Sequence, residues 1–176
     1  SAYHRMRKSY WTTACIEKYR AAMALVRPIC QKWDQKSENW VRVPNHPIEQ
    51  LIDAPNEYQG TAEFFSLIIE NLWLTGNALI TIKDTRSSGT IALEAMNTDL
   101  VKLDLGTKNG QLVEGYEVYK QNWGLSPGNS KSKFVSRKDM IHIRLVNSER
   151  LDWGISPLES VKDVQETESD AVSYNR

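Results

Sequence analysis

The sequence predicts an α+β fold: a small, mainly antiparallel sheet with flanking helices. Two stretches carry apolar residues at steps of three and four, which is the spacing of one helix face. Several short runs rich in β-branched and aromatic residues are separated by turn residues, which is typical of strands. The 176 residues, 40% hydrophobic and 25% charged, suffice for one domain that buries roughly 70% of its unfolded surface.

The first predicted element is a helix that reaches to about Pro28. Cys15 and Cys30 fall in what the pattern predicts as this one helix, about 22 Å apart at 1.5 Å per residue, so they cannot form a disulfide within it. The apolar face of the helix consists of Trp11, Cys15, Tyr19, Met23 and Val26.

A short strand is expected at residues 40–43, after a polar linker or turn, and Pro44 ends it. Asn45 is expected to cap a short helix, which closes before Pro55 because a proline disfavours the helical conformation of the preceding residue.

Thr61 is expected to open the next helix, and Gly76 with Asn77 supplies the left-handed backbone that ends it. A strand over residues 78–83 follows directly. The inward face of the helix is predicted to hold Phe64, Phe65, Ile68 and Leu72.

Residues 86–89 form a predicted turn. Residues 91–94 and 100–105 provide further strands, split by residues 97–99, and an antiparallel hairpin is the economical pairing. Asn109-Gly110 predicts a second hairpin, because a tight turn needs positive φ at both central positions; it would join residues 101–105 to 116–118.

The last third of the chain contains a predicted loop, a strand and a helix start. Residues 122–133 have no apolar period and predict an exposed loop, long enough to contact a partner, and residues 140–145 predict a strand. Ser156, Pro157 and Glu159 form a capping box that opens a terminal helix.

The charge balance is neutral, with 22 Lys and Arg residues against 22 Asp and Glu residues. The chain therefore lacks the basic excess of a dedicated nucleic-acid-binding domain, and any DNA contact would be local. It shows no signal peptide and no apolar span of the length a membrane helix needs, so a reducing intracellular setting is expected. Because it starts at Ser1 and ends inside a helical pattern, it is expected to be a fragment.

Catalytic and metal-binding interpretations find little support in the sequence. His4, His46 and His142 have no partner at metal-ligand spacing. Asp99 and Asp104, near Glu94, would face opposite sides of a strand, so solvated turn acids explain them better than a Mg²⁺ site. The segment 126–131 lacks the glycines and the Gly-Lys-Ser/Thr ending of a phosphate loop. No catalytic residue, cofactor or metal is therefore predicted.

A set of five motifs, in order over residues 45–158, resembles the portal proteins of tailed bacteriophages. These are Pro55-Asn56, Glu63-Phe64, Leu74-x-Gly76-Asn77-Ala78, the strand 139–144, and Gly154-Ile155-Ser156-Pro157-Leu158. Each motif alone is common, and the ordered set carries the resemblance. The structural motif residues that it marks are Pro55, Asn56, Phe64, Gly76, Asn77, Gly154, Ser156 and Pro157.

The resemblance implies the α+β wing region of a portal. Residues 1–44 would be an N-terminal helix and short strand, residues 45–155 the wing-like core, and residues 156–176 the start of a helix leading toward a missing stem. The clip and crown of the family would also be missing. The fragment alone is then expected to be a monomer or a weak oligomer.

The function implied is structural. Portal subunits form a ring, usually a dodecamer, at one capsid vertex of the virion after assembly in the bacterial host cytoplasm. Double-stranded DNA passes through the ring during packaging and ejection. The implied partners are other copies of the subunit, the major capsid or scaffold protein, the terminase, and head-completion or tail proteins. The resemblance implies no enzymatic activity and no membrane association.

A ring would bury apolar surface between neighbouring subunits through two unlike faces, and the tryptophans are candidates for this contact. Core packing is the alternative role for each. A different functional class also stays open: a small α+β enzyme or binding module whose active part lies in a missing C-terminal region. Quaternary structure and the presence of a polar pocket discriminate between the classes. The candidate interface residues are Trp33, Trp40, Trp123 and Trp153.

Overall fold

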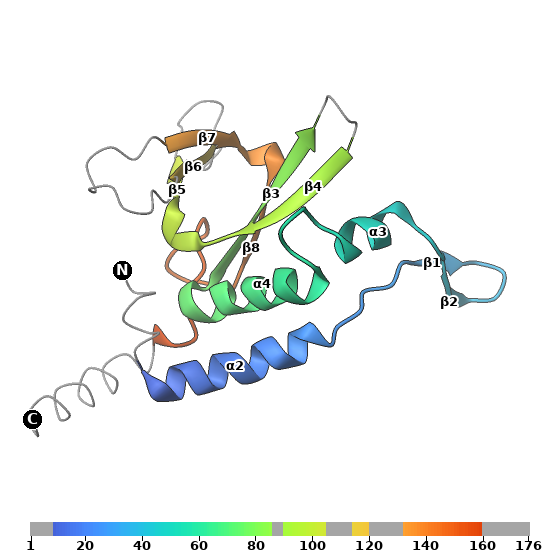
Figure 1. Ribbon diagram of the computed structural model, residues 1–176, viewed down its shortest axis with the longest axis horizontal. Helices are drawn as coiled ribbons and strands as arrows, with labels where there is room; N and C mark the ends of the chain where they lie inside the picture. Colours follow the sequence, from blue (N-terminus) through green and yellow to red (C-terminus); the bar gives the residue numbers. More distant parts are fainter. Residues whose placement is uncertain (1–8, 86–89, 105–113, 120–131, 160–176) are drawn as a thin grey trace, which may run out of the picture.

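Helix α4 (Thr61–Thr75) lies between helix α2 (Tyr10–Ala24) and the strands (Figure 1). The computed structural model describes residues 9–85, 90–104, 114–119 and 132–159. The described strands form three small antiparallel sheets, so the predicted α+β class with a mainly antiparallel arrangement is confirmed.

The first three-stranded sheet has the order β4-β3-β8. Its strands are β3 (Asn77–Thr85), β4 (Thr90–Met96) and β8 (Met140–Arg144). The second sheet has the order β5-β6-β7, with β5 (Val101–Asp104), β6 (Gly115–Tyr119) and β7 (Ser132–Ser136). The short helices η1 (Thr98–Leu100) and η3 (Arg137–Asp139) carry the chain from the first sheet to the second and back.

The first half of strand β3, residues 77–81, is buried on both faces, which explains the apolar run Ala78-Leu79-Ile80. Ala78 and Ile80 pack with Phe64 and Ile68 of α4 on one side. Leu79 points to the other side, into a cluster shared by the two sheets. The other buried members of that cluster are Val101, Tyr116 and Met140.

Helix α4 ends where the sequence predicts. Its last residue is Thr75, and Gly76 adopts the left-handed conformation at φ 75°. The predicted left-handed conformation of Asn77 is wrong, because Asn77 is the first residue of β3 and pairs with Arg144. One glycine suffices to reverse the chain.

The N-terminal third differs most from the prediction. Helix α2 ends at Ala24 rather than near Pro28, so Cys15 and Cys30 do not share a helix, and both are free. The polar stretch includes a strand that was not predicted, β1 (Gln31–Asp34), which pairs with β2 (Asn39–Arg42) as a hairpin.

Three further expectations need correction. His46 caps α3 (Pro47–Asp53) through its Nδ1, whereas Asn45, the predicted cap, has a φ of 57° in the preceding turn. Strand β7 occupies the end of the predicted loop. β4 pairs with β3 and not with β5, because η1 directs the chain into the second sheet.

The predicted antiparallel pairing of residues 101–105 with 116–118 is confirmed by β5 and β6. The turn at Asn109-Gly110, the turn at 86–89, Trp123 and the helix beyond 159 lie outside the described residues. Among the described helices, none is long and apolar enough to cross a membrane.

Candidate functional site

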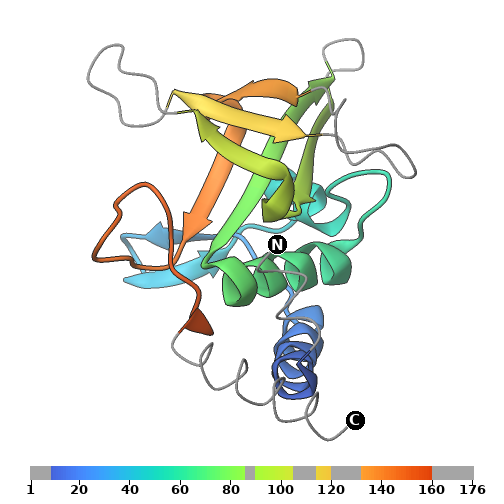
Figure 2. The same cartoon turned by 90° about the vertical axis from the view of Figure 1, so that its left-hand side faces the viewer.

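Four of the motif residues meet at one place, where residues 154–156 cross the end of α4 and the start of β3. They are the pair Gly76 and Asn77 and, more than 70 positions later, Gly154 and Ser156. Asn77 hydrogen-bonds to Gly154, and the backbone of Gly76 touches that of residues 154–155. Ser156 bonds to Trp73 in the last turn of α4. Figure 2 shows the chain after β8 running back past the end of α4. We call this contact the crossing.

The two backbones at the crossing are too close for side chains. A Cβ atom on Gly154 would lie 2.1 Å from the carbonyl oxygen of Gly76. A Cβ atom on Gly76 would lie 2.3 Å from the carbonyl carbon of Ile155. The Gly76 carbonyl also accepts a hydrogen bond of 2.8 Å from the amide of Leu145. Glycine is therefore needed on both strands of the crossing.

The side chain of Asn77 fastens the crossing. Asn77 is fully buried, and its Oδ1 accepts a hydrogen bond of 2.7 Å from the amide of Gly154. Its Nδ2 donates to the carbonyls of Gly154 (3.2 Å) and Thr75 (2.6 Å). Because both the oxygen and the nitrogen of this buried side-chain amide are hydrogen-bonded to backbone groups, Asn77 joins the two backbones as a neighbouring strand would.

Ser156 attaches the segment to α4 itself. Its hydroxyl donates to the carbonyl of Trp73 at 2.7 Å and accepts from the amide of Leu158 at 3.0 Å. Leu158 packs beside Ile16 of α2 and Leu74 of α4. The same side chain therefore caps the following turn and anchors it to the helix. Pro157 itself is exposed.

Pro55 and Asn56 lie away from the crossing, at the free edge of β4. The carbonyl of Pro55 accepts from the amide of Leu93 at 2.7 Å, and Asn56 Nδ2 donates to the carbonyl of Leu93 at 2.7 Å. Asn56 Oδ1 accepts from the amides of Tyr58 and Gln59. The loop thus covers an otherwise unpaired strand edge. Phe64, the remaining motif residue, lies in the core between α4 and β3.

Sequence reasoning missed His142 as a member of the site. Its ring lies 3.0 Å from Asn77 Oδ1 through Nε2 and 3.3 Å from the Tyr116 hydroxyl through Nδ1. Burial, with a smaller contribution from the Arg144 charge, lowers the pKa of His142 to about 4, and Asp152 opposes the shift. Strand alternation was the available signal, since it places His142 on the same face as the buried Met140.

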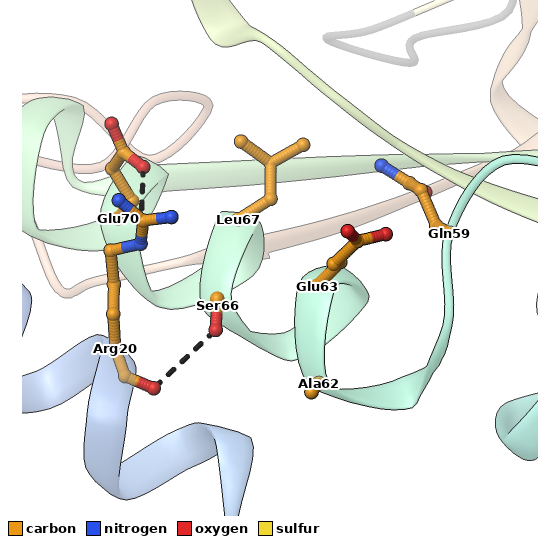
Figure 3. Close-up of a pocket in the computed structure, with 7 residues that line it drawn as sticks. All are labelled: Arg20, Gln59, Ala62, Glu63, Ser66, Leu67 and Glu70. Atoms are coloured by element: carbon orange, nitrogen blue, oxygen red, sulfur yellow. Dashed lines mark hydrogen bonds and ion pairs between the residues drawn. The ribbon is translucent and has the colours of Figure 1, made fainter.

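The described part of the chain also contains a hollow of about 340 Å³ between α2 and α4 (Figure 3). Two of its polar side chains, Arg20 and Ser66, contact other groups of the protein, although Arg20 Nε itself has no hydrogen-bond partner in the part that the structure describes. Arg20 faces the buried Glu70 at 3.7 Å and bonds to Glu17, and the Ser66 hydroxyl donates to the carbonyl of Arg20. We see in it no nucleophile with an adjacent base. Among the described residues, no group of three His, Cys, Asp or Glu side chains is arranged to hold a metal ion.

The candidate interface tryptophans lie in different environments. Trp33 and Trp40 are 51% and 59% exposed and form an edge-to-face pair with ring centroids 5.6 Å apart on the β1–β2 hairpin. The hairpin projects from the body of the molecule (Figure 1). Trp153 is partly buried and packs against the cluster between the two sheets, which is the core alternative.

These features define an α+β domain in which most of the motif residues connect backbone segments that are distant in sequence. The model of the family described as "Phage portal protein" matches residues 12–176. The chain belongs to the phage portal protein family.

Solved structures with the same fold come from gene transfer agent (GTA) particles. A chain from the neck of an empty GTA particle, computed with C6 symmetry, matches with a TM-score of 0.74 at 19% identity, over 97% of this chain and 43% of that one. A chain from the virion of the native particle gives 0.71 at 18% identity, over 99% and 43%. A chain from the native neck, computed with C12 symmetry, gives 0.71 at 16%, over 97% and 41%.

This chain therefore spans about two fifths of the length of these solved chains. No curated protein matches it.

Proposed function

We propose that the protein containing this chain is a portal, a ring of identical subunits that connects head and tail at one vertex of a phage-like particle. The family match over residues 12–176 is the observation that carries the proposal. The fold shared with neck chains of particles computed with sixfold and twelvefold symmetry supports a ring, and a dodecamer is the form we expect.

The ring would be the passage for double-stranded DNA during packaging and ejection. Its partners would be the terminase, the major capsid or scaffold protein, and head-completion or tail proteins, with assembly in the cytoplasm of the bacterial host. The role is structural and not enzymatic. The neutral charge of the chain is compatible with a position away from the DNA path.

Within such a ring, the β1–β2 hairpin is our candidate for the contact between neighbouring subunits. Its strand residues are exposed except for Asp34, which is half-buried. Side-chain contact with the body comes through Glu49, which accepts from the Cys30 amide at 2.6 Å and lies 3.7 Å from Arg42. A two-stranded hairpin with an exposed aromatic pair is marginally stable alone, and a neighbour that covers Trp33 and Trp40 would stabilise it.

The motif residues have a different role in this proposal. The crossing of Gly76-Asn77 and Gly154-Ser156 holds residues 154–156 against the end of α4 and the start of β3. We propose that residues 45–155 act as one rigid wing and that the crossing sets the orientation of the segment 156–176 toward the stem.

Electron microscopy of the protein expressed from its full reading frame tests the proposal. Closed rings with a central opening wide enough for duplex DNA, near twelvefold in symmetry, are the expected result. Compact particles without rings at high protein concentration would contradict it.

A further inference from the structure

Four polar groups from three parts of the fold are hydrogen-bonded in series. The hydroxyl of Tyr116 on β6 lies 3.3 Å from His142 Nδ1 on β8, and His142 Nε2 lies 3.0 Å from Asn77 Oδ1 on β3. Asn77 Oδ1 also accepts the amide of Gly154 at 2.7 Å. The series thus runs from the second sheet, through the first, to the segment that follows β8.

The direction of each hydrogen bond in the series is fixed. Asn77 cannot be reversed, because its Nδ2 already donates to the carbonyls of Thr75 and Gly154. Its Oδ1 is therefore the acceptor, so His142 Nε2 must carry the proton. His142 Nδ1 is then an acceptor in the neutral ring, and the Tyr116 hydroxyl must donate to it. The orientation of Asn77 thus sets the tautomer of His142 and the direction of the hydrogen bond from Tyr116.

Packing connects the same elements in parallel with the hydrogen bonds. The His142 ring contacts the rings of Trp153 and Tyr116, with centroids 5.4 Å and 5.8 Å away. Trp153 directly precedes Gly154 and packs against the cluster that contains Tyr116. Close-packed side chains move together, so a displacement of Tyr116 on β6 would also displace Trp153, the residue next to the crossing.

We propose that Tyr116, His142 and Asn77 act as positioning residues that couple the β5–β6–β7 sheet to the crossing. A contact that displaces β6 then changes the stability of the crossing. Because coupling between two sites is reciprocal, a weaker crossing also changes the surroundings of the His142 ring. The coupling is a property of the chain itself. Its use in a ring, to pass a contact on the second sheet to the residues beyond 159, rests on the proposed function.

Hydrogen exchange of single amides in the 176-residue chain tests the coupling. Tyr116→Phe removes one hydroxyl and no packing atom of the ring. We expect the Gly154 amide to exchange faster relative to the Leu93 amide, by a factor of at most about five, the factor that corresponds to the Tyr116–His142 hydrogen bond that is lost. The Leu93 amide, which bonds to the Pro55 carbonyl on the opposite edge of the first sheet, corrects for any change in global stability.

Tyr119→Phe is the matched control. It removes the same hydroxyl from the same strand, where the group donates to Glu117 and not to His142. This variant should leave the Gly154 amide unchanged. Equal effects of the two substitutions, or no effect of Tyr116→Phe on the ratio of the Gly154 and Leu93 rates, would overturn the proposal.

A reciprocal measurement covers the case in which Tyr116→Phe fails to fold. Ser156→Ala removes the bonds to Trp73 and Leu158 without touching the series. We expect the ¹⁵N resonance of His142 Nδ1 to shift in this variant, and an unchanged resonance would count against the coupling. Both experiments use the isolated 176-residue chain, so their results decide the coupling whether or not rings form. An absence of rings in electron microscopy would refute only the proposed function.

Discussion

At the scale of single residues, the crossing depends on two glycines without a Cβ atom and on the side chain of Asn77. The backbones at Gly76 and Gly154 are so close that neither residue could carry a Cβ atom. This close approach lets the Asn77 side chain reach both the amide and the carbonyl of Gly154. The contact is short because the two backbones touch directly. Small residues at such a point are a steric requirement and not a matter of flexibility.

Gly154→Ala should therefore lower the free energy of unfolding by about 3 kcal/mol or more, because backbone atoms of Gly76 would have to move. Chemical denaturation monitored by tryptophan fluorescence measures the loss. Gly60→Ala is the control, since a Cβ atom there meets nothing within 4 Å, and it should cost less than about 1 kcal/mol. Equal losses in the two variants would show that the crossing is less tight than described.

At the scale of elements, two surfaces of the fold need a cover. The edge of β4 is covered from within the chain by Pro55 and Asn56. The β1–β2 hairpin has no such cover among the described residues, and its aromatic pair stays exposed. This contrast is the reason why we assign the hairpin, and not the β4 edge, to a subunit contact.

Asn56→Ala should destabilise the chain by about 2 kcal/mol, because it leaves the Leu93 carbonyl and two loop amides without their side-chain partner. Thermal unfolding of the variant checks this value. Glu57→Ala changes the neighbouring exposed side chain and is expected to be neutral. A neutral Asn56→Ala would mean that the loop does not hold the strand edge.

A double substitution, Trp33→Ser with Trp40→Ser, should shift the protein expressed from the full reading frame from rings toward monomers. The reason is the loss of two large aromatic anchors from the proposed contact. Native mass spectrometry measures the distribution. Tyr58→Ser removes an aromatic ring that is 84% exposed elsewhere and should leave the rings intact. Rings that survive the double substitution would remove the hairpin from the interface.

At the scale of the whole molecule, β3 connects helix α4 to the second sheet. It packs on α4 with one face and on the second sheet with the other, and both cores depend on it. The polar series through His142 lies beside the second core and includes a group whose proton affinity differs between the folded and unfolded chain. Global stability should therefore respond to pH.

Because the pKa of His142 is lowered from 6.5 to about 4 on folding, the unfolded chain binds a proton between these values that the folded chain does not. The unfolding free energy should fall as the pH falls from 6.5 to 4, by about 1–2 kcal/mol, since the ring is only partly buried, and change no further from this group below pH 4. Denaturation of the wild type and of His142→Gln across this range measures it. Parallel pH profiles would exclude His142 as the cause.

The sequence alone determined the elements whose signals are local. The apolar face that begins at Thr61 predicts α4, and the glycine after Thr75 predicts its end. The alternation at residues 140–145 predicts β8, because helix and strand periods depend only on residues close together in sequence. The ordered motifs also indicated the family that the match over residues 12–176 shows.

Only the tertiary structure decided the contacts between distant segments. Strand β1 has a polar sequence, and its pairing with β2, which places Trp33 opposite Trp40, is seen only in the structure. His142 belongs to the site because Asn77, 65 positions earlier, meets it across two paired strands. Sequence periodicity reports the burial of a face but not which residue covers it, so the crossing and its polar series could be found only in three dimensions.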